Sequence, residues 1–266
     1  MLDELFNLKG RVAAVTGGAR HLGYDMAAIL AEAGCDLVIT SRTAASAEKA
    51  AEQLRADWQC DVLPLEVDIA DHDRVDRFAE EAEAWKGHVD ILVNNAGGGS
   101  GASAGHLFQR DPADIVNLIH INLVGPLMCC KAVAPKMAER GHGKIINIAS
   151  IAGILGRDRR MYERAEMSGQ PIDYAAAKAG VIGMTLDLAC LLAPMGIHVN
   201  AISPGGFGPR ELSDGFVRDF SERTAMGRMG RDGVDLKGAA LFLASPASDY
   251  VVGQNLVVDG GFSIWH

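Results

Sequence analysis

Residues 11–23 read Arg-Val-Ala-Ala-Val-Thr-Gly-Gly-Ala-Arg-His-Leu-Gly, and this stretch sets the expectation for the whole fold. Its first six residues form an apolar run typical of a buried strand, and a helical pattern follows its last glycine. Glycines between a strand and a helix let the backbone approach a phosphate group, and the helix N-terminus supplies free N–H donors. The stretch therefore predicts a phosphate-binding turn, although a merely tight strand–helix connection has the same pattern.

The alternation of short apolar runs and helical patterns continues along the whole chain. Because most runs are apolar at consecutive positions, they are typical of parallel strands covered on both faces. Helical patterns lie at 24–33, 44–57 and 71–85. The predicted strands are 11–16, 36–40, 62–67, 90–94, 144–150, 197–203 and 255–258. We expect an α/β fold, a doubly wound parallel sheet of seven strands with helices on both faces, in a single domain over residues 1–266.

Composition excludes several classes of function. The chain has 266 residues, of which 48% are hydrophobic, and this content excludes disorder. Its formal net charge of −9 argues against nucleic acid or an anionic membrane surface as the main partner. With no signal-peptide pattern and no apolar stretch of about 18 residues, we expect a cytoplasmic protein that does not cross a membrane. Five cysteines without C-x-x-C spacing and eight histidines without metal-ligand spacing predict no metal site.

The end of the second predicted strand bears on the choice of cofactor. An acidic side chain there would accept hydrogen bonds from the ribose hydroxyls of NAD and would repel the 2′-phosphate of NADP. Here the strand ends in Thr40-Ser41-Arg42, and Arg20 lies in the first turn. Two guanidinium groups beside the ribose favour NADP, with NAD still possible and solvated surface arginines as the alternative.

A tyrosine and a lysine further along the chain suggest acid–base chemistry. Tyr174 and Lys178 lie four residues apart, on one face of a helical pattern. A tyrosine hydroxyl ionises at about pH 10, so it needs a neighbouring positive charge to exchange protons at neutral pH, and Lys178 supplies one. Ser150 ends the fifth predicted strand at its carboxyl edge, where its hydroxyl can hold a substrate oxygen. A Tyr-x-x-x-Lys spacing taken alone also arises by chance.

Together these motifs resemble those of the classical short-chain dehydrogenase/reductase family over nearly the whole chain, residues 11–261. The resemblance implies a Rossmann-type fold and a small-molecule carbonyl or alcohol substrate. It implies that Tyr174 is the proton donor or acceptor and that Ser150 orients the substrate. It further implies that Lys178 binds the nicotinamide ribose and lowers the tyrosine pKa, and that Asn122 holds a water in a proton relay.

The resemblance also implies a set of cofactor-binding residues. The set combines the glycine-rich turn, the adenine-side pair Asp68-Ile69, the motif Asn94-Asn95-Ala96-Gly97 and residues that follow the sixth strand. The cofactor-binding residues expected in this way are Gly17, Arg20, His21, Leu22, Gly23, Ser41, Arg42, Asp68, Ile69, Asn95, Ala96, Gly97, Tyr174, Lys178, Pro204, Gly205 and Phe207.

The sequence offers a separate reason for the role of Asn122. Pro126 has no N–H, so it cannot donate a hydrogen bond to the carbonyl four residues earlier in a helix, which is that of Asn122. We therefore expect the helix to kink at this point and to leave the Asn122 carbonyl free for a relay water.

Two positions depart from the family pattern. His21 stands where the family usually has glycine, and its imidazole can donate to the pyrophosphate, weaken its binding or face solvent. After Pro204-Gly205 the family often has a threonine that contacts the nicotinamide amide, whereas Gly206-Phe207-Gly208-Pro209 offers none. The pattern therefore defines the adenine side of the cofactor site better than the nicotinamide side.

Two long segments near the predicted site bear on the substrate. The stretch between Ser150 and Tyr174 is longer than usual for the family, and its inserted loop, 157–171, carries charged side chains that can bind hydroxyls or a carboxylate. A solvated loop or a subunit contact is the alternative. Segment 205–230 is expected to be a substrate lid. With Pro204-Gly205-Gly206-Phe207, the insertion resembles members that act on sugars, sugar acids or polyols.

Two other interpretations stay open. A 3-oxoacyl thioester is the alternative substrate, and a dinucleotide-sensing protein without turnover is the alternative of another class, since the fold alone excludes neither. Intact Ser150, Tyr174, Lys178 and Asn122 weigh against a sensor, which needs no complete proton relay. The chain ending, 255–261, resembles that of the family, in which tetramers are common, and so implies a homotetramer.

Overall fold

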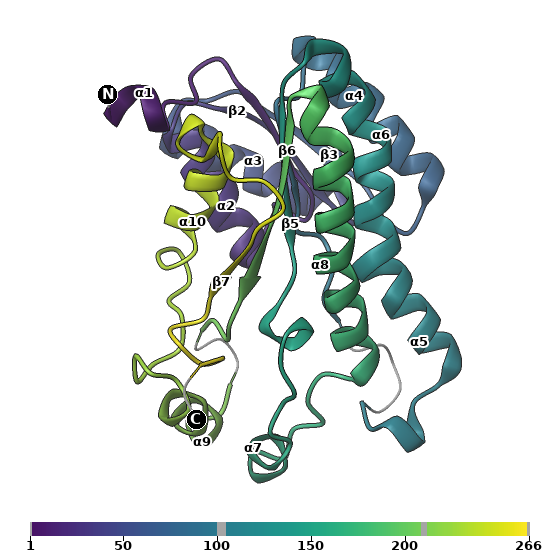
Figure 1. The fold of residues 1–266 in the computed structure, drawn as a ribbon, viewed down its shortest axis with the longest axis vertical. Helices are drawn as coiled ribbons and strands as arrows, with labels where there is room; N and C mark the ends of the chain where they lie inside the picture. Colours follow the sequence, from purple (N-terminus) through teal and green to yellow (C-terminus); the bar gives the residue numbers. More distant parts are fainter. Residues whose placement is uncertain (1, 100–104, 209–211, 265–266) are drawn as a thin grey trace.

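The computed structural model describes residues 2–99, 105–208 and 212–264, and seven parallel strands form one sheet at its centre (Figure 1). The strand order is β3-β2-β1-β4-β5-β6-β7. The strands are β1 (Val12–Val15), β2 (Asp36–Ser41), β3 (Val62–Glu66), β4 (Ile91–Asn94), β5 (Gly143–Ile148), β6 (Ile197–Pro204) and β7 (Asn255–Val258). The predicted doubly wound parallel sheet is confirmed, and each predicted strand matches an observed one to within two residues at either end.

Local signals in the sequence explain several helix boundaries. Thr43 caps α3 by accepting a hydrogen bond from the backbone N–H of Ser46, and Asp71 caps α4 by accepting one from the backbone N–H of Arg74. The α-helices are α1 (Leu2–Phe6), α2 (His21–Glu32), α3 (Ala44–Trp58), α4 (His72–Lys86), α5 (Pro112–Ile119), α6 (Gly125–Arg140), α7 (Arg160–Arg164), α8 (Ile172–Leu192), α9 (Asp214–Glu222) and α10 (Lys237–Ala244). The 3₁₀ turns are η1 (Leu107–Gln109), η3 (Ile151–Gly153), η4 (Ala193–Met195) and η5 (Pro246–Ser248).

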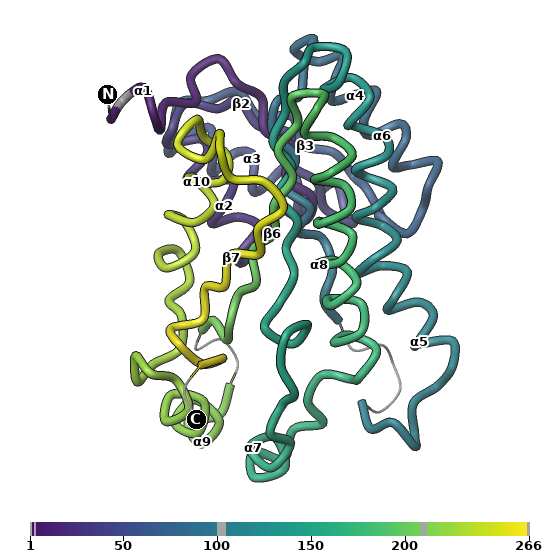
Figure 2. The backbone as a smooth tube through the Cα atoms, in the orientation of Figure 1, coloured from purple at the N-terminus to yellow at the C-terminus, as the bar shows by residue number. Residues whose placement is uncertain are grey.

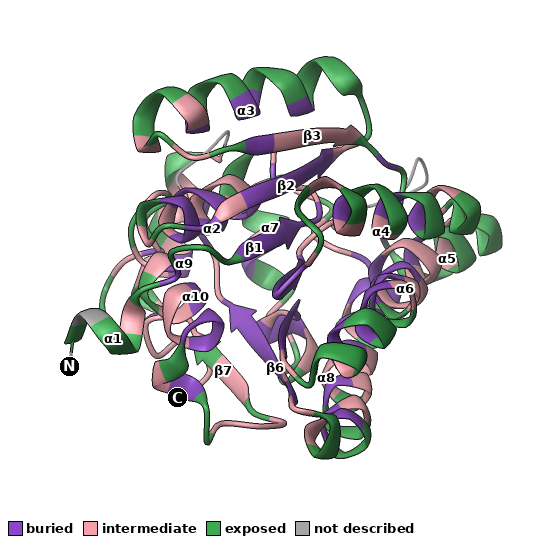
Figure 3. Ribbon diagram, turned by 90° about the horizontal axis from the view of Figure 1, so that it is seen from above, coloured by how far each residue is buried: buried purple, intermediate pink, exposed green. Residues whose placement is uncertain are grey.

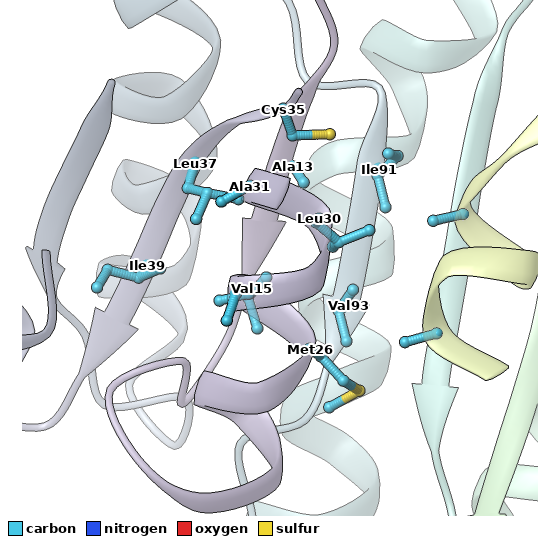
Figure 4. Packing of buried hydrophobic residues seen from close by; sticks show 14 of the residues in the cluster. Ala13, Val15, Met26, Leu30, Ala31, Cys35, Leu37, Ile39, Ile91 and Val93 are labelled. Carbon is cyan, nitrogen blue, oxygen red and sulfur yellow. The ribbon is translucent and has the colours of Figure 1, made fainter. Parts of the chain in front are cut away.

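Helices cover the sheet on both faces (Figure 3). On one face α2, α3 and α10 pack together, and Figure 4 shows Met26 and Leu30 of α2 lying against Val15 and Val93 of the sheet. On the other face, residues of α4, α6 and α8 share a second hydrophobic cluster, which contains the fully buried Phe78 of α4. Full burial of one large apolar side chain contributes about 1.5–3 kcal/mol. The two clusters therefore hold the three layers together.

The direction of the chain through the sheet reverses between β1 and β4. From β1 it moves outward through β2 to β3, then crosses back to β4 and continues on the other side to β7. In open α/β sheets, ligands bind in the crevice at the carboxyl ends of the strands that flank such a reversal. The glycine-rich turn after β1 and the Asn95-Ala96-Gly97 segment after β4 both start from this point of the sheet.

The two long segments singled out from the sequence, 157–171 and 205–230, lie together at the carboxyl end of the sheet (Figure 2). The first contains α7 and the second contains α9. Tyr162 of α7 lies against Phe216 of α9, with ring centroids 5.2 Å apart. We call the described parts of these two segments the cap. Residues 209–211 of the expected lid lie outside the described residues.

The chain around Asn122 is helical but not a regular α-helix. A π-helical turn, η2 (His120–Val124), joins α5 to α6. Pro126 has no N–H to donate to the preceding turn, and a π turn is one way in which a helix accommodates such an interruption. The irregularity expected at Asn122 is therefore present, in the form of a π turn.

Two helical segments, Pro112–Arg140 and Ile172–Met195, are long and apolar enough to cross a membrane by length and composition alone. This corrects the expectation that the chain has no such stretch. In this fold both segments lie along the sheet, as the core helices of globular proteins do, and 33% of each apolar window is buried inside the chain. Isolated charged residues such as Lys131 and Asp187 interrupt the two segments, so each uncharged apolar stretch in the sequence is shorter than the helix that contains it.

Candidate active site

A cleft of about 1400 Å³ opens where the strand order reverses. Residues after β1 to β6, residues of α8 and residues of the cap line it. Every predicted site residue lines the cleft except Asn122. The predicted residues that line it are Gly17, Arg20, His21, Leu22, Gly23, Ser41, Arg42, Asp68, Ile69, Asn95, Ala96, Gly97, Ser150, Tyr174, Lys178, Pro204, Gly205 and Phe207.

The turn after β1 suits an anion. A Cβ atom at Gly23 would collide with the carbonyl oxygen of Gly17 and the side-chain amide of Asn95, so this position requires glycine. α2 starts at His21, and its N-cap residue, Arg20, makes no side-chain hydrogen bond to the helix. The start of α2 therefore lacks a capping side chain from its N-cap residue. The backbone N–H groups and the dipole at a helix N-terminus fit a pyrophosphate group.

His21 stands in a left-handed backbone conformation, with φ of 50°. Its side chain is exposed and lines the cleft beside Arg20 and Leu22. For a residue with a Cβ atom this conformation costs about 1 kcal/mol or more. The backbone of the turn thus keeps a conformation that suits glycine, and the substitution to histidine strains it. α2 also begins three residues before the helical pattern that was expected at 24–33.

The adenine end of the cleft presents two cations. Ser41 ends β2, and Arg42 follows it. An acidic residue at the end of this strand would favour NAD, but here the strand end carries a hydroxyl and a guanidinium. The side chains of Arg20 and Arg42 are both exposed and both line the cleft. After β3, the carboxylate of Asp68 accepts a hydrogen bond of 3.0 Å from the backbone N–H of Ala70. This arrangement fits a phosphorylated ribose, since each guanidinium can bind phosphate oxygens in a bidentate fashion.

Asn95 fastens the glycine-rich turn to β4. Its side-chain amide donates to the carbonyl oxygens of Thr16 (3.0 Å) and Gly17 (3.1 Å). The hydroxyl of Thr16 in turn accepts hydrogen bonds from the backbone N–H groups of Asn95 and Ala96. Asn95 therefore holds the glycine-rich turn in place through these hydrogen bonds, and it also lines the cleft.

Asn122 is fully buried and holds the backbone of the neighbouring loop. Its Oδ1 accepts a hydrogen bond of 2.7 Å from the N–H of Gly98, and its Nδ2 donates to the carbonyls of Gly98 (3.2 Å) and Leu118 (3.0 Å). A Cβ atom at Gly97 would lie 2.7 Å from Asn122 Oδ1 and 3.8 Å from Lys178 Nζ. The amide of Asn122 is thus committed to positioning the loop, which leaves its backbone carbonyl as the group that can hold a water.

Ser150, Tyr174 and Lys178 meet at the other end of the cleft. The Nζ of Lys178 donates to the carbonyl oxygen of Ile148 (2.8 Å) and lies 5.7 Å from the centre of the Tyr174 ring. Ser150 does not end β5 as expected, because the strand stops at Ile148 and Ser150 caps the turn η3. Its hydroxyl accepts a hydrogen bond of 3.1 Å from the backbone N–H of Ala152. Leaving the strand brings this hydroxyl to the cleft.

The electrostatic environment of Tyr174 differs from the one expected. Burial raises the pKa of its hydroxyl, while hydrogen bonds to Ser150 and Gln170 and the positive charge of Arg157 lower it. Burial also lowers the pKa of Lys178 to about 8. Arg157 of the inserted segment therefore adds a positive charge near Tyr174, besides the amine of Lys178 that lies 5.7 Å from its ring.

Besides Arg157, which belongs to the charged insertion noted in the sequence, Tyr174 has neighbours that the sequence reasoning missed. Gln170 and Arg157 approach the tyrosine from the inserted segment. Asp173, next to Tyr174 in sequence, accepts a hydrogen bond of 2.7 Å from Nη2 of Arg110, and both side chains are buried. An acidic residue beside a predicted catalytic tyrosine is a weak local signal. Nothing near Arg110 in the sequence indicates its partner, which lies more than sixty residues away along the chain.

Within the described ranges, no group of three His, Cys, Asp or Glu side chains is arranged to hold a metal ion. The five cysteines are free, and burial raises the pKa of Cys129 and Cys130 well above the ordinary value. His198, which has no sequence sign of metal binding, contacts the amine of Lys144 at 2.9 Å. These residues lie outside the lining of the cleft.

Comparison with known proteins agrees with this geometry. The family model described as Enoyl-(Acyl carrier protein) reductase matches residues 17–263. A 2-dehydro-3-deoxy-D-gluconate 5-dehydrogenase of Formosa agariphila is 36% identical, with 98% of this chain and 96% of that protein covered. An NADP-dependent mannitol dehydrogenase of Hypocrea jecorina is 35% identical, with 98% and 96% covered.

Solved structures give the same result. A gluconate 5-dehydrogenase of Burkholderia cenocepacia, in complex with NADP and tartrate, is 37% identical, with 99% of each chain covered and a TM-score of 0.87. Sequence similarity thus extends over the sheet, the cleft and the segments that close it. Since both the sequence matches and the shared architecture span almost all of its length, the chain belongs to the classical short-chain dehydrogenase/reductase family.

Proposed function

We propose that this protein is an NADP-preferring oxidoreductase that transfers hydride reversibly between the nicotinamide and a carbonyl or secondary alcohol, most suitably of a sugar, sugar acid or polyol. One observation carries the proposal. One cleft is lined both by a candidate anion site and by candidate catalytic residues. The anion site combines the start of α2 with the cations Arg20 and Arg42. The catalytic residues are Ser150, Tyr174 and Lys178. An anionic dinucleotide laid along this cleft would end beside a proton-exchanging tyrosine.

Each catalytic residue has a distinct task in this proposal. The hydroxyl of Ser150 holds the substrate oxygen, and the hydroxyl of Tyr174 gives that oxygen its proton on reduction or takes it on oxidation. The bound nicotinamide supplies or accepts the hydride. Lys178 holds the nicotinamide ribose from the buried side of the cleft. The Asn122 carbonyl holds the relay water, while its side chain keeps Gly98 in place.

The substrate class is supported by three relatives that match over nearly the whole chain. Their names describe dehydrogenases of a deoxy-ketogluconate, of mannitol and of gluconate. A 3-oxoacyl thioester remains the second candidate, because the matching family model is described as a reductase of acyl-carrier-protein substrates. A dinucleotide sensor without turnover is disfavoured by the assembled Ser150, Tyr174 and Lys178.

The proposal is tested by removing one oxygen atom. Tyr174→Phe deletes the hydroxyl that exchanges the proton, and general acid–base catalysis typically contributes about 10²- to 10⁴-fold. Initial rates of NADPH oxidation and NADP⁺ reduction are measured with 5-keto-D-gluconate, D-gluconate, D-mannitol and an acetoacetyl thioester. We expect at least a hundredfold loss. Tyr250→Phe is the matched control, because Tyr250 is fully exposed outside the cleft.

Melting temperatures of the same purified proteins, measured with NADPH and with NADH, test which cofactor is preferred. We expect NADPH to raise the melting temperature of the protein more than NADH does. Only NADPH carries a 2′-phosphate on its adenine ribose, and this is the group that we propose Arg20 and Arg42 bind. Unchanged turnover in Tyr174→Phe refutes the catalytic proposal. Stronger stabilisation by NADH refutes the NADP preference alone.

We further propose that the chain is one domain with the cap as part of its active site, and that it acts as a cytoplasmic homotetramer. Free cysteines support the cytoplasmic location. Apolar side chains left exposed on three neighbouring helices support association. Val116 of α5, Leu127 of α6, and Leu186 and Leu191 of α8 are between 39% and 68% exposed.

A further inference from the structure

Arg157 occupies a distinctive place in the cleft. It is the first residue of the inserted segment, is partly buried, and lines the cleft together with Tyr174. Its Nη1 donates to Oε1 of Gln170 (3.3 Å), and its Nη2 donates to the carbonyl oxygen of Pro171 (3.0 Å). These two bonds fix the guanidinium beside the start of α8, where Tyr174 lies. They use two of its five N–H donors, and a hydrogen bond with the Tyr162 side chain uses another.

Of the other charged groups of the inserted segment, Arg159 is exposed outside the cleft lining and donates to the carbonyl oxygen of Gln170 (2.8 Å), and three more form ion pairs. Asp158 bonds to Arg160 (2.8 Å) and to Arg223 of the lid segment (3.2 Å). Arg164 bonds to Asp219 of α9 (2.7 Å). The contacts Asp158–Arg223 and Arg164–Asp219 join the two segments of the cap, and all three contacts pair opposite charges. They contribute no free cation to the cleft.

Arg157 differs from the paired arginines of this segment because it lacks a carboxylate partner. Among the residues that the structure describes, it forms no ion pair with Asp or Glu, and its hydrogen bonds go to neutral oxygens. Burial lowers the pKa of its guanidinium, as expected for a cation removed from water without a counter-charge. The positive charge of Arg159 lowers the pKa of Arg157 further, whereas the side chains of Tyr162 and, more weakly, Tyr174 raise it. A partly buried cation of this kind is best stabilised by an anion that enters the cleft.

The walls around Arg157 are mostly apolar. Side chains from α7, from α9 and from the segments beyond α9 meet in one hydrophobic cluster next to the cleft. A charge-assisted hydrogen bond is stronger in such surroundings than in water. The apolar residues that line this end of the cleft include Met161, Phe216, Phe220, Met229 and Phe262.

We infer that Arg157 is the binding site for a carboxylate group of the substrate, so that the enzyme acts on hydroxy acids and oxo acids in preference to neutral polyols and thioesters. This inference rests on the proposed function and narrows its substrate class. The free N–H donors of the guanidinium match the two oxygens of a carboxylate. The carboxylate anchors the molecule while Ser150 and Tyr174 hold its reacting oxygen.

The test compares probes that differ only in the acidic group. D-gluconate and D-sorbitol differ in a carboxylate against a hydroxymethyl group, and both are assayed as substrates. Cyclohexanecarboxylate and cyclohexanecarboxamide carry no hydroxyl and cannot be oxidised at one, so they are titrated as ligands of the protein with NADP⁺ present. Arg157→Gln removes the cation. Arg160→Gln is the matched control, because Arg160 belongs to the same segment but its side chain is 76% exposed.

We expect wild type to use gluconate with at least tenfold higher kcat/KM than sorbitol, and to bind the carboxylate more tightly than the carboxamide. A hydrogen bond to a charged group contributes about 1.5–3 kcal/mol, so Arg157→Gln should raise KM for gluconate roughly 10- to 150-fold. KM for sorbitol, the affinity for NADPH and the carboxamide affinity should stay within twofold. Arg160→Gln should match wild type in all four measurements.

Two outcomes would overturn the inference. One is a preference for sorbitol over gluconate together with carboxamide binding as tight as carboxylate binding. The other is an equal loss for the acidic and the neutral probes in Arg157→Gln, which would indicate a structural role. If wild type oxidises no probe, the proposed function fails, and the titration with cyclohexanecarboxylate still decides whether Arg157 binds a carboxylate.

Discussion

At the scale of single residues, Lys178 combines a functional position with an electrostatic cost. Its amine is buried, and its hydrogen bond goes to a neutral carbonyl, that of Ile148. Burial lowers the pKa of Lys178 from 10.5 to about 8 in the folded protein without cofactor. Between these two values the unfolded chain binds more protons than the folded one, so stability rises with pH.

This cost gives a prediction with a definite sign. We expect the free energy of unfolding of wild type, minus that of Lys178→Met, to increase by about 3 kcal/mol between pH 7 and pH 10.5. The difference isolates Lys178, since all other titrating groups are shared by the two proteins. Urea denaturation at several pH values measures it. A difference that stays level with pH would show that the amine is already solvated.

His21 carries strain that can be measured separately from its chemistry. His21 has φ of 50°, where a Cβ atom strains the backbone, and replacement by glycine removes that strain. The gain in folding free energy is partly offset by the larger conformational entropy of glycine in the unfolded chain. We expect His21→Gly to stabilise the cofactor-free protein by about 0.5–1 kcal/mol. Gln59→Gly is the control, because Gln59 has φ of 53° in an exposed position at the end of α3. A loss of stability in His21→Gly would mean that contacts of the imidazole outweigh the strain.

Residue spacing reveals a site only where its members share an element or a motif. Tyr174 and Lys178 were predictable because both lie on one helix. The contact between Asn122 and Gly98 joins segments that meet only after the sheet has formed, so its role in fixing the loop was not predictable. The charged insertion 157–171 was expected to bind hydroxyls or a carboxylate, but the sequence does not distinguish Arg157, which lines the cleft, from Arg160, which does not.

At the scale of elements, a buried ion pair holds the start of α8. Arg110, which follows η1, donates from Nη2 to Asp173, the residue before Tyr174, and the two side chains are 0% and 1% exposed. The pair therefore ties the catalytic helix to the segment that leads into α5. Its strength bears on the position of Tyr174 as well as on stability.

We expect Asp173→Asn to lower the free energy of unfolding by about 1.5–3 kcal/mol, because it removes the nearer of two carboxylates from the buried Arg110 and leaves Asp114 at 3.7 Å. Turnover should fall as well, since the start of α8 loses its attachment. Glu139→Gln is the control, because Glu139 and its partner Lys136 are 63% and 54% exposed, and such pairs contribute at most about 1 kcal/mol. Equal stability of the two variants would show that the Arg110 charge finds other partners.

Elements were more predictable than their ends. Consecutive apolar residues marked most strands, because strands buried on both faces leave no polar side to interrupt the pattern. The run 144–150 stays apolar beyond the last sheet pairing, so the sequence extended β5 to Ser150. The long helices were underestimated for the opposite reason, since single charges at exposed positions interrupt otherwise apolar stretches.

At the scale of the whole molecule, the exposed apolar faces of α5, α6 and α8 predict association. We expect light scattering after gel filtration to give the mass of four copies of the 28.1 kDa chain. Leu186 of α8 is 53% exposed in the single chain. Leu186→Arg places a charge on this exposed apolar face, so it should reduce the mass of the assembly measured by light scattering. Lys237→Glu, at the start of α10 on the opposite side of the sheet, should not. A monomeric wild type would leave these faces without the partner that we propose.

The cap has a consequence for how new specificities arise on this scaffold. Its two halves come from distant parts of the chain, yet Tyr162 packs on Phe216, and Arg164 and Asp158 pair with Asp219 and Arg223. A substitution that reshapes one half therefore disturbs the other half as well. Libraries that diversify 157–171 and 205–230 together should yield more altered-specificity enzymes than libraries of equal size confined to either segment.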